Sequence, residues 1–211
     1  MLIGISGKMG SGKNEVADMI SFLLFKNPNG TFNQFREAQD IRNNFLDSND
    51  IVKAQLTLPN IHSFADNLKK CVGICCGINF NELNKQNVKS SKIPWMNISY
   101  RQLLQRFGQG IRTAIDNYFW SESLLQNYKD SDFWIISDLR YIEEAESILN
   151  RGGYLIRINR KQNSYDNHIS ETNLDNYDNF NAILDNDGSL AELFEKVKNL
   201  LIRAKILLEI K

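Results

Sequence analysis

The glycine-rich stretch at residues 7–13, close to the start of the chain, constrains the fold more than any other feature. Its letters, GKMGSGK, fit the pattern G-x-x-x-x-G-K, and Asn14 stands where Ser or Thr usually completes it. A short apolar run at residues 2–5 precedes the stretch, and apolar residues recur at helical spacing over residues 14–24. This order predicts a strand, a phosphate-binding loop and a helix.

The chemistry of a bound phosphate explains why these residue types occur together. Glycines let the backbone turn its N–H groups toward phosphate oxygens, and the helix that follows adds partial positive charge at its N-terminus. Lys13 would bring a full positive charge to the outer phosphates. The amide of Asn14 is a poorer Mg²⁺ ligand than a hydroxyl group, so direct metal contact is not expected there. A glycine-rich turn without function is the alternative, but strand, loop length, lysine and helix all agree against it.

Length and charge narrow the class of protein. A chain of 211 residues is long enough for one domain with insertions and a substantial core. Its 25 basic residues balance its 25 acidic residues, so the charge indicates neither a nucleic-acid groove nor a partner membrane. No apolar run is long enough for a membrane span, and the chain begins on an apolar strand without the pattern of a signal peptide. We therefore expect a cytoplasmic protein.

A polar stretch and a group of cysteines interrupt the apolar pattern. Residues 26–60 are rich in asparagine and predict a surface insertion, with a modest helix over residues 35–45. Cys71, Cys75 and Cys76 lie too close together for a disulfide framework, and the two histidines of the chain are too few for a zinc site. We expect these thiols on the buried face of a helix.

Charged residues follow two of the expected strands. Residues 61–66 predict a short strand that ends in Asp66, and residues 133–137 form the near-continuous apolar run of a central parallel strand before Asp138. Because ligands of open α/β sheets bind at the carboxyl ends of strands, Asp66 and Lys69 are expected beside the phosphate-binding loop if their strand neighbours the first strand. Asp138 is likewise expected at the end of a strand beside the loop. A carboxylate at the position of Asp138 holds Mg²⁺ or its water molecules in such proteins. An ordinary solvated lysine is an equal alternative for Lys69.

Arginines gather on a helical segment in the middle of the chain. Ser99 is expected to cap a helix that Gly108 and Gly110 interrupt, before a second helical piece that runs to Trp120. The candidates for binding an anionic substrate are Arg101, Arg106 and Arg112. A single helix arginine is usually solvated or ion-paired, but three near two glycines favour at least one phosphate contact.

The last third of the chain continues the alternation of strands and helices. Arg140 follows the central strand, and acidic residues then begin a helix, as the helix dipole favours. Residues 154–158 predict a further strand, and the polar, basic segment at about 160–173 predicts a lid over the phosphates. A short strand at residues 182–184 and an amphipathic helix over residues 190–206 complete the pattern.

Seven short motifs occur in this order: G-K-x-x-S-G-K, F-A-D-x-L-K, R-x-L-L-Q-x-x-G, I-S-D-x-R-x-x-x-E-A-E, G-G-x-x-I-R-I-x-R, H-I-S-E and N-D-G-S-L-x-E-L. Together they resemble the viral and bacteriophage deoxynucleoside monophosphate kinases, of the adenylate-kinase-like P-loop group. The resemblance covers most of residues 1–16 and 61–200, and the insertion at 26–60 is outside it. It implies a three-layer P-loop NTPase fold with a central parallel sheet. Residues 1–211 would form a single domain, with a monophosphate-binding insertion at 77–120 and the lid.

The resemblance also implies a role for each matching position. The donor ATP would be bound by Gly10, Ser11, Gly12, Lys13, Asn14 and Asn186. The monophosphate substrate would be surrounded by Lys8, Lys69, Arg101, Gly108, Gln109, Trp120, Asp138, Arg140, Glu144 and His168. Lys13, Arg140 and Arg160 would neutralise charge during the transfer. Asp138 would hold Mg²⁺ through water.

Two positions depart from the family pattern. The family usually has Asp-Thr after the loop lysine, where this chain has Asn14 and Glu15, which affects the metal arrangement rather than the phosphate cradle. The family's G-T-E or G-T-D becomes residues 108–110, Gly-Gln-Gly, so substrate contacts there are expected to differ.

The implied activity is transfer of the γ-phosphoryl group of ATP, with Mg²⁺, to a deoxynucleoside 5′-monophosphate, for the supply of viral DNA precursors. Two alternatives stay open. The first is another small-molecule P-loop kinase, acting on dephospho-coenzyme A or a ribonucleotide, and the second is a non-catalytic nucleotide-binding module. The sequence names neither the accepted bases nor the means by which ribose is excluded. A homodimer is among the oligomeric states that it leaves open, and a viral protein of this kind would work in the host cytoplasm.

Overall fold

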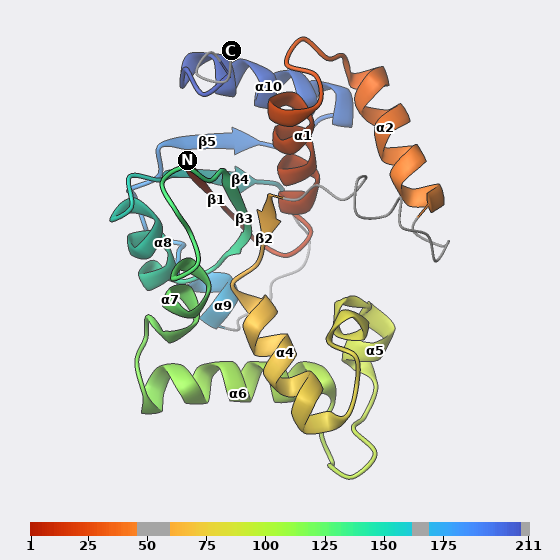
Figure 1. Ribbon diagram of the computed structural model, residues 1–211, viewed down its shortest axis with the longest axis vertical. Helices are drawn as coiled ribbons and strands as arrows, with labels where there is room; N and C mark the ends of the chain where they lie inside the picture. Colours follow the sequence, from red (N-terminus) through yellow and green to blue (C-terminus); the bar gives the residue numbers. More distant parts are fainter. Residues whose placement is uncertain (46–59, 162–168, 208–211) are drawn as a thin grey trace.

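Apolar residues that recur along short segments build a parallel sheet at the centre of the molecule. The computed structural model describes residues 1–45, 60–161 and 169–207, and helices cover both faces of the sheet (Figure 1). In chain order the elements are β1 (Leu2–Gly7), α1 (Lys13–Phe25), α2 (Phe32–Phe45), β2 (Ile61–His62), α4 (Ala65–Cys76), the 3₁₀ helix η1 (Phe80–Asn84), α5 (Gln86–Ser90), α6 (Tyr100–Ala114), α7 (Phe119–Leu125), β3 (Trp134–Leu139), α8 (Ile142–Leu149), β4 (Tyr154–Asn159), α9 (Ile169–Thr172), β5 (Ala182–Asp185) and α10 (Leu190–Arg203). The predicted three-layer α/β fold with a central parallel sheet is confirmed.

The order of the strands locates the ligand-binding edge of the sheet. The order is β2-β3-β1-β4-β5, and each neighbouring pair is parallel. β1 therefore lies between β3 and β4, and the chain crosses over β1 when it passes from one to the other. In open α/β sheets this reversal leaves a crevice at the carboxyl ends of the strands, where ligands bind. The phosphate-binding loop follows β1 at this place.

Alternating residues of the strands divide the core between the two faces. Ile3 and Ile5 of β1 pack with the apolar sides of α1 and α10, whereas Leu2 packs on the opposite face against α7 and α8. Figure 1 shows the same division, with α1 and α10 on one side of the sheet and α7 and α8 on the other. Gly4 leaves room for α8, because a Cβ atom there would lie 2.6 Å from Cδ1 of Ile148.

The polar stretch after α1 is partly a packed element. We expected a surface insertion at residues 26–60, and α2 instead packs Phe35 into the core on the outer side of α1 and α10. The ring of Phe35 lies 5.6 Å from the ring of Phe22 and 5.6 Å from that of Phe194. Phe32 and Ala38 of the same helix pack against this cluster as well, so one apolar side of α2 holds it on the core. Residues 46–59 lie outside the described residues.

Four helices form an arm that extends from the carboxyl end of the sheet. Figure 1 shows α4, α5 and α6 below the sheet, in line with the phosphate-binding side. The arm has a small core of its own, made of Val72, Leu83, Ile93 and Tyr100. Ser99 caps α6 as predicted, in a capping box with Gln102. The arm corresponds to most of the substrate-binding region predicted at 77–120, with α4 added.

The predicted break in the middle of the arm does not occur. α6 continues through Gly108 and Gly110 to Ala114. Gly108 is buried where α6 crosses α4, and a Cβ atom there would lie 3.1 Å from Cδ2 of Leu68. The glycine thus serves close helix packing, and a single glycine costs a helix only about 1 kcal/mol relative to alanine.

The expectation of buried cysteines was wrong. Cys71 and Cys75 are exposed, and Cys76 is only half-buried. The packed side of α4 runs through Leu68, Val72 and Cys76 at four-residue intervals, so positions 71 and 75 lie beside it and face outward.

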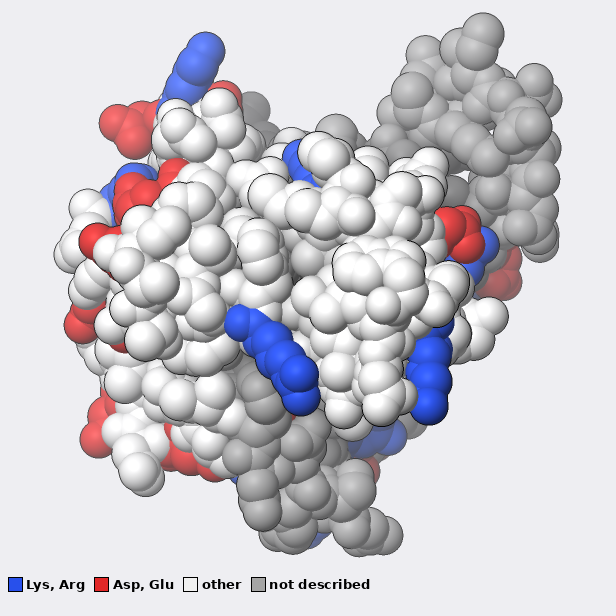
Figure 2. Space-filling model, turned by 90° about the horizontal axis from the view of Figure 1, so that it is seen from below, with Lys and Arg blue, Asp and Glu red and all other residues white. Residues whose placement is uncertain are grey.

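Charged side chains are scattered over the surface of the arm side. Figure 2 shows this face from below, with isolated basic side chains on a largely uncharged surface and acidic side chains toward its edges. Among the helices that the structure describes, none has both the length and the apolar character that a membrane crossing requires.

Candidate functional site

The phosphate-binding loop has the backbone that its glycines permit. Gly10 and Gly12 take φ angles of 79° and 96°, which residues other than glycine rarely adopt. Asn186, 5% exposed, donates a hydrogen bond of 2.9 Å from Nδ2 to the carbonyl oxygen of Ser11. A Cβ atom on Gly12 would lie 2.5 Å from this amide nitrogen. Asn186 therefore braces the loop from the turn after β5, and its predicted contact with adenine stays a prediction.

Lys13 is folded back onto the loop. Its Nζ donates to the carbonyl oxygens of Gly7 at 2.6 Å and Lys8 at 2.8 Å, and the residue is 9% exposed. Burial, and then the nearby Arg140 guanidinium, lower the pKa of Lys13 to about 8. The loop thus holds the Lys13 amine in a place where an anion that binds beside it would favour the protonated, charged form. Ser11 Oγ is buried without a hydrogen-bond partner in the described part of the chain, so it is a further group available to an anion.

Asp138 ties β3 to the start of the arm. Its Oδ2 accepts hydrogen bonds from Ser63 Oγ at 2.5 Å and from the backbone N–H of Ala65 at 3.1 Å. Its Oδ1 accepts from the backbone N–H of Phe64 at 2.8 Å. A carboxylate has about four acceptor positions, so roughly one is left. The carboxylate is therefore held at the N-terminus of α4 with little capacity to spare.

A magnesium ion would find few protein ligands here. No group of three or more His, Cys, Asp or Glu side chains that could hold a metal occurs within residues 1–45, 60–161 and 169–207. Mg²⁺ keeps several water molecules and is usually bound by one or two carboxylates together with substrate phosphates. The remaining acceptor position of Asp138 suits one hydrogen bond from such a water molecule. The predicted contact through water therefore fits the donor set and stays a prediction.

Arg140 is neutralised by an acid from the segment after β4. Its Nη1 forms an ion pair with Oε1 of Glu171 on α9. The other oxygen of Glu171 accepts the backbone N–H of Met9 in the phosphate-binding loop at 2.7 Å. A carboxylate thus bridges an arginine and a loop N–H group, which are both groups that bind phosphate oxygens.

A buried ion pair fixes the turn that carries Arg140. Arg112 of α6 donates from Nη2 to Glu144 of α8, and both residues are under 7% exposed. Glu144 Oε2 accepts the backbone N–H groups of Arg140 at 2.8 Å and Tyr141 at 3.1 Å. The guanidinium of Arg112 lies 3.8 Å from the centre of the Tyr141 ring and donates to the carbonyl oxygen of Asn117. Burial raises the pKa of Glu144 to about 7, against the opposing effects of Arg112 and the two N–H groups.

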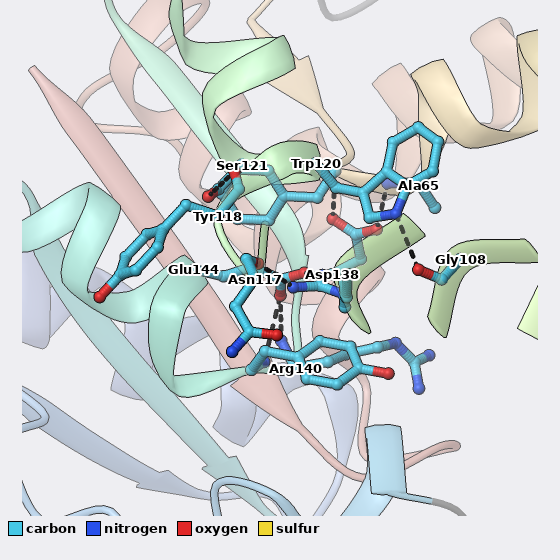
Figure 3. A network of polar contacts seen from close by, with 12 residues as sticks. Ala65, Gly108, Asn117, Tyr118, Trp120, Ser121, Asp138, Arg140 and Glu144 are labelled. Atoms are coloured by element: carbon cyan, nitrogen blue, oxygen red, sulfur yellow. Dashed lines mark hydrogen bonds and ion pairs between the residues drawn. The ribbon is translucent and has the colours of Figure 1, made fainter. Parts of the chain in front are cut away.

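Figure 3 shows this network from close by. Glu144 lies between Asn117 and the turn of Arg140, and Asp138 faces Ala65. The indole of Trp120 points to the arm, where its Nε1 donates to the carbonyl oxygen of Gly108 at 3.0 Å. The ion pair between Arg112 and Glu144, the contact of Glu144 with the backbone of Arg140, and the hydrogen bond of Trp120 join α6, α7, α8 and the end of β3 around one space.

That space is a cavity of about 210 Å³ between the arm and the sheet, and it meets a larger one of about 850 Å³ along the phosphate-binding loop. Residues from α4, α5, α6, α7, β3, α8 and α9 line the smaller cavity. The loop, the start of α1 and the end of β2 line the larger cavity. Six residues line both: Met9, Ala65, Lys69, Lys89, Asp138 and Arg140. They mark a junction at the carboxyl edge of the sheet.

The structure brings most of the predicted site residues to these two cavities. The smaller is lined by Lys69, Arg101, Gly108, Gln109, Trp120, Asp138, Arg140 and Glu144, and the larger by Gly10, Gly12, Lys13 and Asn14. Lys8, Ser11 and Arg160 line a third hollow beside the loop, where Arg160 donates to the carbonyl oxygen of Gly10 at 3.3 Å. Asn186 lies behind the loop. His168 and residues 162–167 of the predicted lid lie outside the described residues.

The sequence did not reveal the roles of three residues near the junction. Arg112 was taken as one candidate for an anionic substrate, but it is committed to Glu144 inside the protein. Glu171 occurs in the H-I-S-E motif, and nothing in its sequence position indicates an ion pair with Arg140. Lys89 is one lysine in a polar stretch that contains several, so no local signal marks it. All three depend on contacts between residues that are far apart in the chain.

Comparison with known proteins agrees with this geometry. The family described as deoxynucleotide monophosphate kinase matches residues 51–197. A protein of Enterobacteria phage T4 named deoxynucleotide monophosphate kinase is 32% identical over 133 residues, which cover 59% of this chain and 54% of the phage protein. Its namesake in Escherichia phage RB69 is 30% identical over 110 residues, 49% of this chain and 45% of that protein. A putative deoxynucleotide monophosphate kinase of Acanthamoeba polyphaga mimivirus is 26% identical over 153 residues, 64% of this chain and 79% of that protein.

The match with this chain spans about half the length of the two phage relatives. The family match, in contrast, extends over well over half of this chain and includes the arm, β3 and β4. It contains the residues that line the smaller cavity, except Met9 of the loop. The chain belongs to the deoxynucleotide monophosphate kinase family.

Proposed function

We propose that this protein transfers the γ-phosphoryl group of ATP to the 5′-phosphate of a deoxynucleoside monophosphate and releases ADP and the deoxynucleoside diphosphate. The junction of the two cavities carries this proposal. The larger cavity, along the phosphate-binding loop, and the smaller cavity, lined by cations, share Lys69, Arg140 and Asp138, so two phosphorylated ligands would meet there. Family membership supports the acceptor class.

The donor would lie along the loop. The loop N–H groups and Ser11 Oγ would take the outer phosphates, and Lys13 would leave its carbonyl partners for a phosphate oxygen. Arg160, close to Gly10, would add charge from the strand side. Mg²⁺ that arrives with ATP would neutralise phosphate charge, and Asp138 would hold one of its water molecules.

The acceptor would lie in the smaller cavity. Its phosphate would face Lys69, Arg101 and Arg140, and its deoxynucleoside part would lie along Trp120 and Gln109. An acceptor phosphate is already anionic, so its oxygen can attack the γ-phosphorus without a general base. The new P–O bond forms as the bond to the β,γ-bridging oxygen breaks, and the electron pair leaves with ADP. The protein's part is in-line positioning and neutralisation of charge.

The test is a coupled assay of ADP release with ATP, Mg²⁺ and a panel of acceptors. The panel holds the deoxynucleoside monophosphates, the ribonucleoside monophosphates and dephospho-coenzyme A. Turnover with one or more deoxynucleoside monophosphates supports the proposal. Turnover with dephospho-coenzyme A or ribonucleotides alone would favour another small-molecule kinase, and no acceptor-dependent turnover a non-catalytic nucleotide-binding module.

Substitution of the loop lysine sharpens this test. Lys13→Ala removes the charge that would follow the transferred group, so kcat is expected to fall by about 10²-fold or more. Urea unfolding should show that the variant still folds. Lys26→Ala, an exposed lysine just beyond α1, is the matched control and should keep the wild-type rate. Near-normal turnover by Lys13→Ala would contradict the role of Lys13.

A further inference from the structure

A lysine that belongs to none of the sequence motifs lies at the junction of the two cavities. Lys89 belongs to α5 in the arm and lines both the smaller cavity and the larger one, as Lys69 and Arg140 do. Those two come from α4 and from the end of β3, so Lys89 approaches the junction from a separate wall.

The packing of α5 keeps Lys89 in this place. Val88 packs against the core of the arm, which includes Leu83 of η1 and Tyr100 of α6. The next position of this short helix is half-buried at the cavities, whereas Lys85, one turn earlier, is exposed and pairs with Glu82 at 2.9 Å. Two lysines of the same segment therefore have different surroundings.

Lys89 belongs to a cluster of cations with too few anions. Burial lowers the pKa of Lys89, the charges of Lys69, Arg101 and Arg140 lower it further, and the Asp138 carboxylate alone opposes them. Lys69 is balanced by Asp66 and Arg140 by Glu171.

The other two cations of the cluster lack partners. Within the described residues Lys89 has no hydrogen bond or ion pair, and Nη2 of Arg101 is buried with no acceptor. Half-buried cations without partners lose part of their hydration, and an anion that binds between them restores favourable contacts. Two unpaired positive charges beside one cavity match the double negative charge of a phosphate monoester.

We infer that Lys89, together with Arg101, binds the 5′-phosphate of the acceptor monophosphate at the junction. The inference rests on the proposed function, since it assigns a further residue to the same acceptor site. The arm contributes Lys89 and Arg101 from α5 and α6, while the sheet contributes Arg140. The acceptor phosphate would then connect the arm to the sheet.

The experiment compares a phosphorylated ligand with its unphosphorylated counterpart. The probes are the deoxynucleoside monophosphate with the highest kcat/KM in the acceptor panel and the matching deoxynucleoside as a competitive inhibitor. In Lys89→Met the KM and the dissociation constant of the monophosphate are expected to rise about 10- to 100-fold, because a charged hydrogen bond to phosphate is lost. The inhibition constant of the deoxynucleoside and the KM of ATP should change by less than about twofold, because neither ligand uses the acceptor-phosphate subsite.

Two further variants separate this role from a structural one. Lys85→Met removes an exposed lysine of the same segment and should leave all constants at wild-type values. Lys89→Arg keeps the charge and should recover most of the monophosphate affinity.

Four results would overturn the inference. They are unchanged monophosphate binding in Lys89→Met, equal weakening of monophosphate and deoxynucleoside, failure of Lys89→Arg to recover affinity, and a lower kcat with unchanged monophosphate affinity. If the wild-type protein turns over no monophosphate, the proposed function fails, and the inference fails with it. Wild-type turnover combined with any of the four results refutes the role of Lys89 alone.

Discussion

Single charged residues around the junction are held by neighbours that compete with a ligand. Lys13 donates to two loop carbonyl oxygens, and Arg140 pairs with Glu171. Each of these contacts has to be exchanged for a phosphate contact when substrates bind. The protonation of Lys13 and the affinity of the site for phosphate therefore depend on the groups that hold Lys13 and Arg140 before a ligand binds.

The lowered pKa of Lys13 predicts how activity depends on pH. Because the free enzyme loses this proton at about pH 8, kcat/KM for ATP is expected to fall tenfold per pH unit above that value. Bound phosphates favour the charged amine, so kcat at saturating ATP should keep its value to higher pH. Rates measured from pH 6 to 10 check both limbs, and a flat kcat/KM profile up to pH 10 would contradict the shift.

The same pKa has a consequence for stability. The unfolded chain keeps the Lys13 proton up to its ordinary pKa of 10.5, while the folded protein releases it at about 8. Between these values the unfolded state binds more protons, so this residue makes the free energy of unfolding rise with pH. At neutral pH both states are protonated, and the residue leaves the pH dependence of stability unaffected.

The ion pair of Arg140 predicts the effect of a neutral substitution. Glu171→Gln keeps an acceptor for the N–H of Met9 and removes the charge that competes for Arg140. The monophosphate KM is expected to fall about fivefold, since a partly exposed pair contributes roughly 1 kcal/mol. Glu122→Gln removes the acid of a distant pair with Arg151 and should have no effect. A higher KM in Glu171→Gln would mean that Glu171 orients Arg140 for the substrate.

Among the secondary-structure elements, α6, α7 and α8 form a support for the end of β3. Arg112 crosses from α6 to Glu144 of α8, and Glu144 holds the backbone of Arg140. Trp120 of α7 closes the same space by its hydrogen bond to Gly108. The arm is thus connected to the carboxyl edge of the sheet by a buried charge pair and an indole.

The buried pair predicts a large loss of stability when it is broken. Arg112→Met leaves Glu144 buried and uncompensated, so the free energy of unfolding is expected to fall by about 3–5 kcal/mol at pH 8. The loss should be smaller at pH 6, because the Glu144 carboxyl can then take a proton. Urea unfolding at the two pH values measures both effects.

Two variants provide the controls for this pair. Arg112→Met with Glu144→Leu leaves no buried charge and should recover a substantial part of the lost stability. Arg151→Met removes the arginine of the more exposed pair with Glu122 and should cost no more than about 1 kcal/mol. If Arg112→Met costs as little as Arg151→Met, Glu144 is not held as a buried carboxylate.

At the level of the whole molecule, two packed bodies of unequal size face each other across the site. The sheet with its helices has two large apolar clusters, whereas the arm has one small cluster around Val72, Leu83, Ile93 and Tyr100. Local opening is easiest where few apolar contacts are buried. The arm is therefore expected to open locally at lower cost than the sheet.

Hydrogen exchange of the native protein tests this difference. Amides of α6 are expected to exchange with a lower opening free energy than those of β1 and β3, because the arm buries less apolar surface. The deoxynucleoside monophosphate should slow exchange in the arm, and ATP alone should slow it mainly in the loop and α1. Equal opening free energies in the arm and the sheet would contradict a separately packed arm.

The order of the elements and the position of the phosphate-binding loop follow from local patterns in the sequence. These features are local, because a strand period, a helix period and a run of glycines are written in neighbouring residues. The central strand predicted at residues 133–137, which the structure has as Trp134–Leu139, and the helix cap at Ser99 could be predicted for the same reason.

The pairing of charged side chains depends on the packing of the folded chain. This packing turned the cysteines of α4 outward, continued α6 through Gly108, and committed Arg112 to Glu144. It also placed Lys89 at the junction, although no sequence pattern distinguishes that lysine from its neighbours. Such pairings depend on the approach of helices and strands that are far apart in the chain. Their energies follow from burial, and burial exists only once the helices have packed on the sheet.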